Sequence, residues 1–248
     1  MVMESAGPRR RLAGVVAAAM LLAAAGMARA ADIHFSLPCQ SLSGDPSDKE
    51  ALVTLVNEIG KQYKGGKVVI DGAFPYARSI SNVVAGKSQV HMALPYAPLT
   101  ASADLPFRYL SPDLFNVTFV LYTNKNSPQI SVQNLRYYRV ETERGHVELF
   151  GFPVRAASSI ESALRKVSVG RLDAFVFAMG TTDAEIRRLG LTNIKRQYFN
   201  TFTSRMVVAR QADTERLDAE LSDIIVRLKQ SGRYAEIMAP LRETAFRE

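Results

Sequence analysis

The sequence predicts an α/β fold built from mostly parallel sheets that are flanked by helices. Two segments carry this prediction, residues 79–94 and residues 158–178, and each runs from an amphipathic helix through a glycine turn into a short apolar strand. A third observation is that strands and helices alternate along the chain before the first of these segments, which is typical of a parallel sheet.

The later segment shows the pattern most clearly. Apolar residues at 160, 163, 164 and 167 share one helical face, Gly170 provides a tight turn, and residues 174–178 form an apolar run typical of a buried strand. Thr182 and Glu185 have the spacing of a capping box, which predicts that the next helix opens at Thr182.

The earlier segment repeats this order. Ile80, Val83 and Val84 share a face, Pro75 suits the first helical turn, and Gly86 suits the helix stop before a strand at residues 90–94. The polar turns that follow both strands would lie at the carboxyl ends of parallel strands, where open sheets bind ligands.

The remaining elements follow from the same reasoning. Ser47 and Glu50 form a further capping box, four prolines make residues 95–113 a loop, and Gly232 interrupts the last helix. We expect strands at 33–37, 68–70, 117–123, 138–143, 154–156, 193–198 and 205–209, and helices at 47–63, 145–152 and 214–230.

The first 30 residues have the features of a secretory signal peptide. Three arginines at 9–11 precede an apolar run at 12–27, and Ala28-Arg29-Ala30 fits the small-x-small cleavage rule. We therefore expect export to the periplasm with cleavage after Ala30, and no membrane span after processing. The alternative is an uncleaved anchor, for which the run of 16 residues is short.

Composition excludes several classes of function. Removal of residues 1–30 lowers the formal net charge from +7 to +4 and leaves no long basic cluster, so nucleic-acid binding is not expected. Cys39 is the only cysteine, which excludes an internal disulfide. His34, His91 and His146 lack metal-ligand spacing, and no phosphate-binding glycine motif occurs, so we expect neither a metal nor a cofactor.

The chain resembles the family 3 solute-binding proteins of ABC transporters, in which a helix, Gly-x-x-Asp and an apolar strand occur once in each lobe. Residues 170–173 match this motif, whereas Gln89 replaces the Asp of the first copy. The segment 228–237 resembles the family's closing Lys-x-x-Gly-x-x-x-x-Ile. The resemblance implies the two-lobe type II periplasmic-binding-protein fold, with a hinge of two crossing strands.

The resemblance also implies lobe boundaries and a ligand cleft. Lobe 1 would comprise residues 31–122 plus 205–248, and lobe 2 residues 125–203. Loops after strand carboxyl ends would enter the cleft between the lobes. The candidate ligand-binding residues on or near them are Gln40, Phe74, Tyr76, Arg78, Pro95, Tyr96, Glu143, Arg144, Met179 and Thr181.

Arg78 is the leading candidate among these residues. It lies near a predicted helix start and could hold a carboxylate or phosphate with its fork, while Phe74, Tyr76 and Tyr96 could form an apolar wall. The alternatives are a solvated arginine and ordinary packing tyrosines. Amino-acid binders of the family place an Arg after the first strand and an Asp after the second. Residues 99–103 and 178–179 offer neither, so we expect a small anion rather than a free amino acid.

The expected function is therefore non-enzymatic capture of a small, anionic solute for an ABC permease or a periplasmic sensor. One alternative is an adaptor without a ligand that binds another periplasmic protein, such as an oxidoreductase. A second is a dehydratase-like enzyme on the same scaffold, in which Glu143 would act as a general acid or base and would need a buried carboxyl of raised pKa. Asp173 is expected to orient the turn before its strand.

Overall fold

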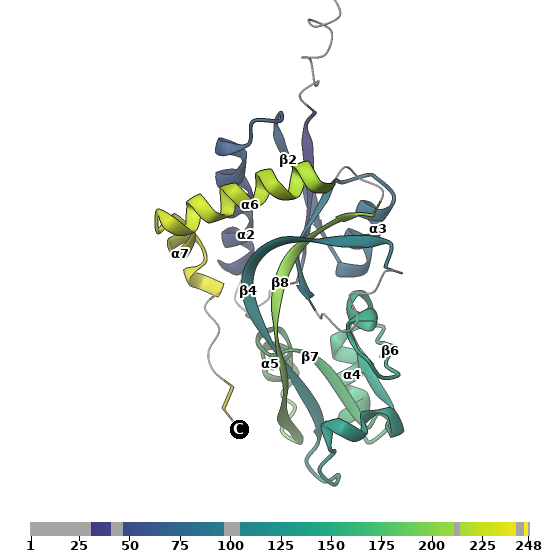
Figure 1. Cartoon of the computed structure of the whole chain (residues 1–248). Coiled ribbons are helices and arrows are strands. Elements are labelled where there is room, and N and C mark those ends of the chain that lie inside the picture. Colours follow the sequence, from purple (N-terminus) through teal and green to yellow (C-terminus); the bar gives the residue numbers. More distant parts are fainter. Residues whose placement is uncertain (1–30, 41–46, 97–104, 211–213, 242–245, 248) are drawn as a thin grey trace, which may run out of the picture. The chain divides into compact units, whose positions relative to one another are not determined.

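An eight-stranded sheet with the order β2-β1-β3-β8-β4-β7-β5-β6 organises the part of the chain that the structure describes (Figure 1). The structure, a computed structural model, describes residues 31–40, 47–96, 105–210, 214–241 and 246–247. The predicted signal peptide lies outside these residues. The strands are β1 (Ile33–Pro38), β2 (Val68–Phe74), β3 (Val90–Tyr96), β4 (Phe107–Asn124), β5 (Val140–Thr142), β6 (Arg155–Ala156), β7 (Ala174–Ala178) and β8 (Ile194–Ala209).

Helices connect and flank these strands. The α-helices are α2 (Ser47–Gln62), α3 (Tyr76–Val84), α4 (Ile160–Ser168), α5 (Met179–Leu189), α6 (Thr214–Gln230) and α7 (Arg233–Ile237), and the 3₁₀ helices are η2 (Val132–Tyr137), η3 (Arg144–Leu149) and η4 (Ala239–Leu241). No helix among the described residues has both the length and the apolar character that a membrane crossing requires.

Two groups of parallel strands lie in this sheet. The first group is β1, β2 and β3, in which β1 pairs with both neighbours, and the second group is β5, β6 and β7, in which β5 does the same. Buried side chains from both groups belong to one hydrophobic cluster, with Phe35 and Phe175 among its fully buried members. The parallel strand groups therefore confirm the expected α/β class.

β4 and β8 run antiparallel through the middle of the sheet and join the two groups (Figure 1). β8 also pairs with β3, and β4 also pairs with β7. The sequence prediction was wrong here in two respects. Residues 107–113 belong to β4 rather than to a loop, and one continuous strand replaces the two expected at 193–198 and 205–209.

The two helix–glycine–strand segments form as predicted. Gly86 and Gly170 have φ values of +70° and +71°, which is the left-handed conformation that glycine adopts most easily. In the second segment, Asp173 Oδ2 accepts a 2.7 Å hydrogen bond from the backbone N–H of Arg139, and the backbone N–H of Asp173 donates to the Arg139 carbonyl. Asp173 thus holds the start of β7 beside the start of β5, which confirms its expected structural role.

Gln89 does the same in the first segment. Its Oε1 accepts a 2.8 Å hydrogen bond from the backbone N–H of His34, and its own N–H donates to the His34 carbonyl. Gln89 therefore holds the start of β3 beside β1, and the replacement of Asp by Gln preserves the geometry of the motif.

The capping box predicted at Thr182 is absent. α5 begins at Met179, directly after β7, and Thr182 lies inside the helix, where its hydroxyl donates a 2.8 Å hydrogen bond to the Ala178 carbonyl. A Thr side chain can satisfy a carbonyl four residues earlier as readily as it can cap a helix, so the spacing alone was ambiguous. The region expected to be helical at 145–152 is a 3₁₀ helix that ends at Leu149.

Candidate functional site

The first and second strand groups meet where α3 packs against η3. Tyr76, the first residue of α3, is only 1% exposed, and its ring lies 4.5 Å from the ring of His146 and 5.8 Å from that of His91, centroid to centroid. We refer to Tyr76, His91, Glu143, Gly145 and His146 as the closure contact. Tyr76 is thus buried inside this contact rather than lining an open cleft.

Gly145 makes the approach of the two helices possible. A Cβ atom built on Gly145 would lie 2.5 Å from the Cβ of Tyr76 and 2.9 Å from the backbone nitrogen of Ala77. Both distances are too short for non-bonded atoms, and one of the neighbours is backbone that cannot rotate away. The closure contact therefore requires glycine at position 145.

Glu143 stabilises the start of η3. Its Oε2 accepts a 2.7 Å hydrogen bond from the backbone N–H of Gly145 and lies 2.8 Å from His146 Nδ1, while its side chain is 11% exposed. The carboxylate thus acts as a helix cap and orients the His146 ring.

His91 is a fully buried histidine with one unsatisfied nitrogen. Its Nδ1 lies 2.6 Å from the hydroxyl of Ser79, which in turn lies 2.7 Å from the hydroxyl of Ser36. Its Nε2 has no partner among the described residues. Burial, reinforced by the proximity of His146, lowers the pKa of the His91 imidazole to about 3, so this ring is neutral at ordinary pH.

Two cavities flank the closure contact. The cleft cavity, of about 660 Å³, lies between α3, the end of β3 and the start of β4 on one side and η3 on the other. The hinge cavity, of about 540 Å³, lies along β8 and is closed by residues 149–152 and by η2. Leu149 and Phe150 line both cavities. Both volumes fall within the range of small-molecule sites.

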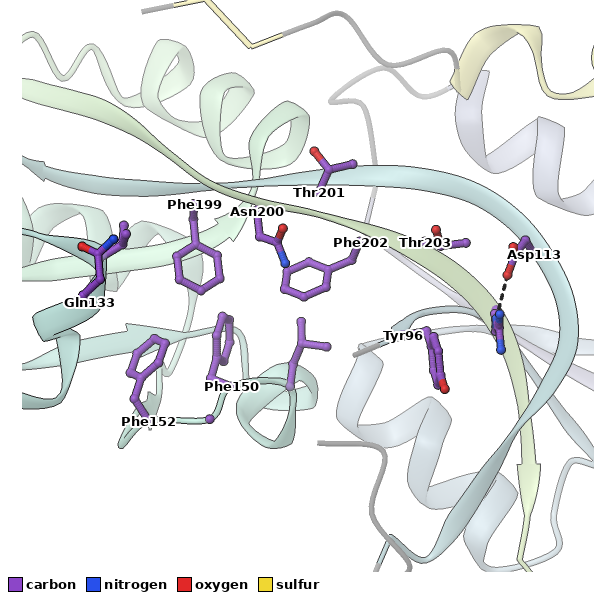
Figure 2. A pocket seen from close by; sticks show the side chains of 14 residues that line it. Tyr96, Asp113, Gln133, Phe150, Phe152, Phe199, Asn200, Thr201, Phe202 and Thr203 are labelled. Carbon is purple, nitrogen blue, oxygen red and sulfur yellow. Dashed lines mark hydrogen bonds and ion pairs between the residues drawn. The ribbon is translucent and has the colours of Figure 1, made fainter. Parts of the chain in front are cut away.

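The hinge cavity is strongly aromatic at one end and charged at the other (Figure 2). Phe150, Phe152, Phe199 and Phe202 lie at the aromatic end, with neighbouring ring centroids 5.4 to 6.3 Å apart. Tyr96 lies at the other end, where the guanidinium carbon of Arg205 is 4.2 Å from the centre of its ring.

The predicted site residues fall into three sets. Pro95 and Arg144 line the cleft cavity, and Tyr96 lines the hinge cavity. Tyr76 and Glu143 belong to the closure contact. Burial raises the pKa of the nearby Cys39 thiol, and the charge of Glu143 adds a smaller contribution to this increase. The set that lines neither cavity comprises Gln40, Phe74, Arg78, Met179 and Thr181.

Arg78 occupies an exposed position on α3. Its guanidinium carbon lies 5.5 Å from the centre of the Phe74 ring, and Phe74 is half-buried at the end of β2. Gln40 is half-buried beside Cys39, whose thiol lies 3.5 Å from the side-chain Oε1 of Gln40. Met179 is buried at the first turn of α5.

Sequence reasoning missed the hinge-cavity residues on β8. The sequence pattern divides this strand in two, which leaves Phe199 and Phe202 between the expected strands and places Arg205 at the start of the second one. The available indication was an arginine at the start of an otherwise apolar return strand.

Comparison with solved structures identifies the fold. A histidine kinase sensor domain with similarity to periplasmic binding proteins has a TM-score of 0.65 at 20% identity and covers 84% of this chain and 95% of its own. The substrate-binding protein of an amino-acid ABC transporter has a TM-score of 0.59 at 17% identity, covering 86% of this chain and 100% of its own.

A third structure belongs to the same group. The arginine-, lysine-, histidine-binding protein ArtJ from Geobacillus stearothermophilus has a TM-score of 0.60 at 11% identity, covering 88% of this chain and 97% of its own. No protein-family model and no curated protein sequence matches this chain. At these identities the likeness establishes the fold, and the chain has the type II periplasmic-binding-protein fold that the sequence predicted.

Proposed function

We propose that this protein is an extracytoplasmic solute-binding receptor that closes over a small molecule at the junction of its two strand groups. One observation carries the proposal: each cavity is lined by residues from both sides of that junction. Ala77 and Leu94 face Arg144 across the cleft cavity, and Tyr96 faces Phe150 across the hinge cavity. An occupant of either cavity would contact both groups only in the closed arrangement, which it would therefore favour.

The proposed solute is an anion. The chain without residues 1–30 has a net charge of +4, and each cavity has one arginine in its lining, Arg144 or Arg205. Arg144 is exposed, and its guanidinium has no hydrogen-bond or ion-pair partner among the described residues. Arg78 lies outside both cavities, and the anion clamp predicted for it remains a separate prediction.

A ligand screen tests this function. The protein without residues 1–30 is mixed with a library of metabolites, and unfolding is followed by thermal denaturation. A ligand at one hundred times its dissociation constant should stabilise the folded state by about 2.7 kcal/mol, which corresponds to several degrees in Tm. We expect anions to dominate the compounds that raise Tm.

Three arginine variants refine the screen. Loss of the effect in Arg144→Ala or Arg205→Ala, with Arg78→Ala unchanged, would support binding in a cavity. Loss in Arg78→Ala alone would support the clamp predicted from sequence. A screen in which no metabolite raises Tm would contradict solute binding.

We also propose export and delivery of the solute to an ABC permease or a sensor. The basis for export is the tripartite N-terminal segment, and mass spectrometry of protein purified from the periplasm tests it. The basis for delivery is the fold that the chain shares with a histidine kinase sensor domain and with the substrate-binding protein of an ABC transporter. We expect an N-terminus at Ala31, whereas a protein beginning at Met1 would contradict processing.

A second candidate is a protein-binding adaptor. The observation that favours it is the closure contact, in which buried Tyr76 and His146 occupy the centre of the junction with the protein's own side chains. An adaptor would show no thermal shift with any metabolite, whereas a dehydratase-like enzyme would consume the compound that it binds.

A further inference from the structure

The hinge cavity has an aromatic wall of four phenylalanine rings. Phe150 and Phe202 are 8% and 7% exposed, and Phe199 and Phe152 are half-buried, so each ring keeps a small part of its surface toward the cavity. The rings of Phe199 and Phe150 meet nearly edge to face at 61°, and Phe202 packs edge to face on Phe119 of the core. Such a wall favours a flat apolar body.

An irregularity in β8 brings the wall together. The ladder pairs Phe119 with Asn200 and then Val120 with Tyr198, which leaves Phe199 as an extra residue on β8. Residues three apart on a regular strand point to opposite faces, yet the rings of Phe199 and Phe202 lie 6.3 Å apart. Bulges of this kind redirect side chains and recur beside binding sites.

Strand register places Arg205 at the other end of the same cavity. β8 lies between β3 and β4, so Arg205 is directly opposite Asp113 of β4 and diagonal to Tyr96 of β3. Its Nε donates a 2.7 Å hydrogen bond to Asp113, and its guanidinium carbon lies over the ring of Tyr96, 4.2 Å from the ring centre. The two terminal nitrogens have no hydrogen-bond partner among the described residues, and the side chain is 25% exposed.

We propose that the hinge cavity binds an aromatic carboxylate, with the carboxylate on the terminal nitrogens of Arg205 and the ring against the phenylalanines. This inference rests on the proposed solute-binding function and names the chemical class of the solute. A guanidinium fixed along one edge by Asp113 and on one face by Tyr96 presents its remaining N–H groups in a defined direction, which suits the two oxygens of a carboxylate.

The same arrangement disfavours other ligands. Asp113, the acidic residue of the cavity lining, already accepts from Arg205, so a free amino acid would lack a partner for its ammonium. A cation would meet the positive charge of Arg205. A short aliphatic acid would make no contact with the aromatic wall, and a neutral aromatic amide would form no ion pair with Arg205.

Titration calorimetry at pH 7.5 and low salt tests the proposal with 3-phenylpropionate as the probe. The comparison compounds are 3-phenylpropionamide, propionate and 3-phenylpropylamine, which remove the charge, remove the ring and reverse the charge. We expect 3-phenylpropionate to bind at least about tenfold more tightly than the amide and the amine, because a charge-assisted pair contributes at least that factor. It should also bind more tightly than propionate, because propionate keeps the charged pair but buries no ring against the phenylalanines.

Three variants assign the site. Arg205→Ala should weaken the binding of 3-phenylpropionate about 10- to 100-fold, and Arg205→Lys, which keeps the charge beside Asp113, should recover only part of it. Phe199→Leu retains an apolar side chain, so its fold should persist, and it should reduce the preference for 3-phenylpropionate over propionate. Arg155→Ala, which removes an exposed arginine of β6 that lines neither cavity, is the matched control and should bind 3-phenylpropionate like the wild type.

Equal affinity for 3-phenylpropionate and its amide would overturn the inference, as would a loss caused by Arg155→Ala but not by Arg205→Lys. In either case the proposed function survives if a metabolite from the library raises Tm. If neither the four probes nor the library bind, the proposed function fails together with this inference.

Discussion

At the scale of single residues, the replacement of Asp by Gln in the first Gly-x-x-Asp motif has a physical reason. Asp173 lies against the guanidinium of Arg139, whose hydrogen bonds hold the pKa of the Asp173 carboxyl below its usual value. Gln89 accepts the equivalent backbone hydrogen bond from His34, whose imidazole Nδ1 lies 2.6 Å from Asp71, and Asp71 also accepts a hydrogen bond from Ser88, the residue before Gln89. A carboxylate at position 89 would have this acidic residue nearby and no arginine, whereas the amide supplies the same acceptor without charge.

Gln89→Asp should therefore destabilise the protein. The new carboxylate would keep the hydrogen bond to His34 but add repulsion from Asp71, with an expected loss on the order of 1 kcal/mol in the free energy of unfolding. Urea denaturation at pH 7.5 measures it. Addition of Asp71→Asn should restore part of the loss, and an unchanged loss in the double variant would contradict the electrostatic explanation.

At the scale of elements, the sequence pattern predicts helices and strands correctly where the structure depends on local chemistry alone. Gly86, Gly170 and Gly232 end or interrupt helices as predicted, because a positive φ is a local requirement. The N-terminal half of β4 was missed because Pro112 and Asp113 disfavour a strand in isolation, and pairing with β8 overrides that preference.

The candidate site was less predictable for the same reason. Arg205, Asp113 and Tyr96 come from three strands, and only the strand order and register bring them together. Tyr96 was expected to line a ligand site and does line a cavity. Spacing along the chain, however, predicts neither its contact with Arg205 nor the phenylalanine wall at the other end of the cavity.

Gly145→Ala is expected to prevent the close contact between α3 and η3 without unfolding the protein. Alanine is acceptable in the local backbone of η3, and the obstacle is Tyr76 and Ala77 on the opposite side of the junction. The variant should keep its far-ultraviolet circular dichroism but lose most of its affinity for whichever metabolite the screen identifies. Small-angle scattering should show a larger radius of gyration than the wild type.

Gly151→Ala is the control for this experiment. A Cβ atom at Gly151 meets nothing within 4 Å, so the variant should scatter like the wild type. Gly145→Ala protein with wild-type scattering and wild-type affinity would show that the contact between α3 and η3 is not required for binding.

At the scale of the whole molecule, buried His91 should make global stability depend on pH. Its pKa is about 3 in the folded protein and about 6.5 when exposed, so between these values the unfolded state binds more protons. His91 therefore does not reduce the free energy of unfolding above pH 6.5, and its effect lowers this free energy progressively as the pH falls from 6.5 toward 3. The maximal slope for one group is about 1.4 kcal/mol per pH unit.

His91→Asn isolates this contribution. Asparagine can place a polar atom near the position of Nδ1 for Ser79, but it does not titrate. Urea denaturation at pH 7.5, 6.5, 5.5 and 4.5 should therefore give a steeper loss of unfolding free energy for the wild type than for the variant. Parallel curves would show that His91 does not govern the acid sensitivity.

The irregularities in the β4–β8 ladder have a mechanical consequence. These two strands connect the two strand groups, so any relative motion of the groups must bend this ladder. We expect the ladder to bend most easily where its pairing is interrupted, near Asp113, Asn116 and Phe119. Asp113 anchors Arg205, and Phe119 supports Phe202. A ligand bound between Arg205 and the phenylalanine rings would connect side chains that are held at two of these interruptions. Its binding would therefore make the β4–β8 ladder harder to bend.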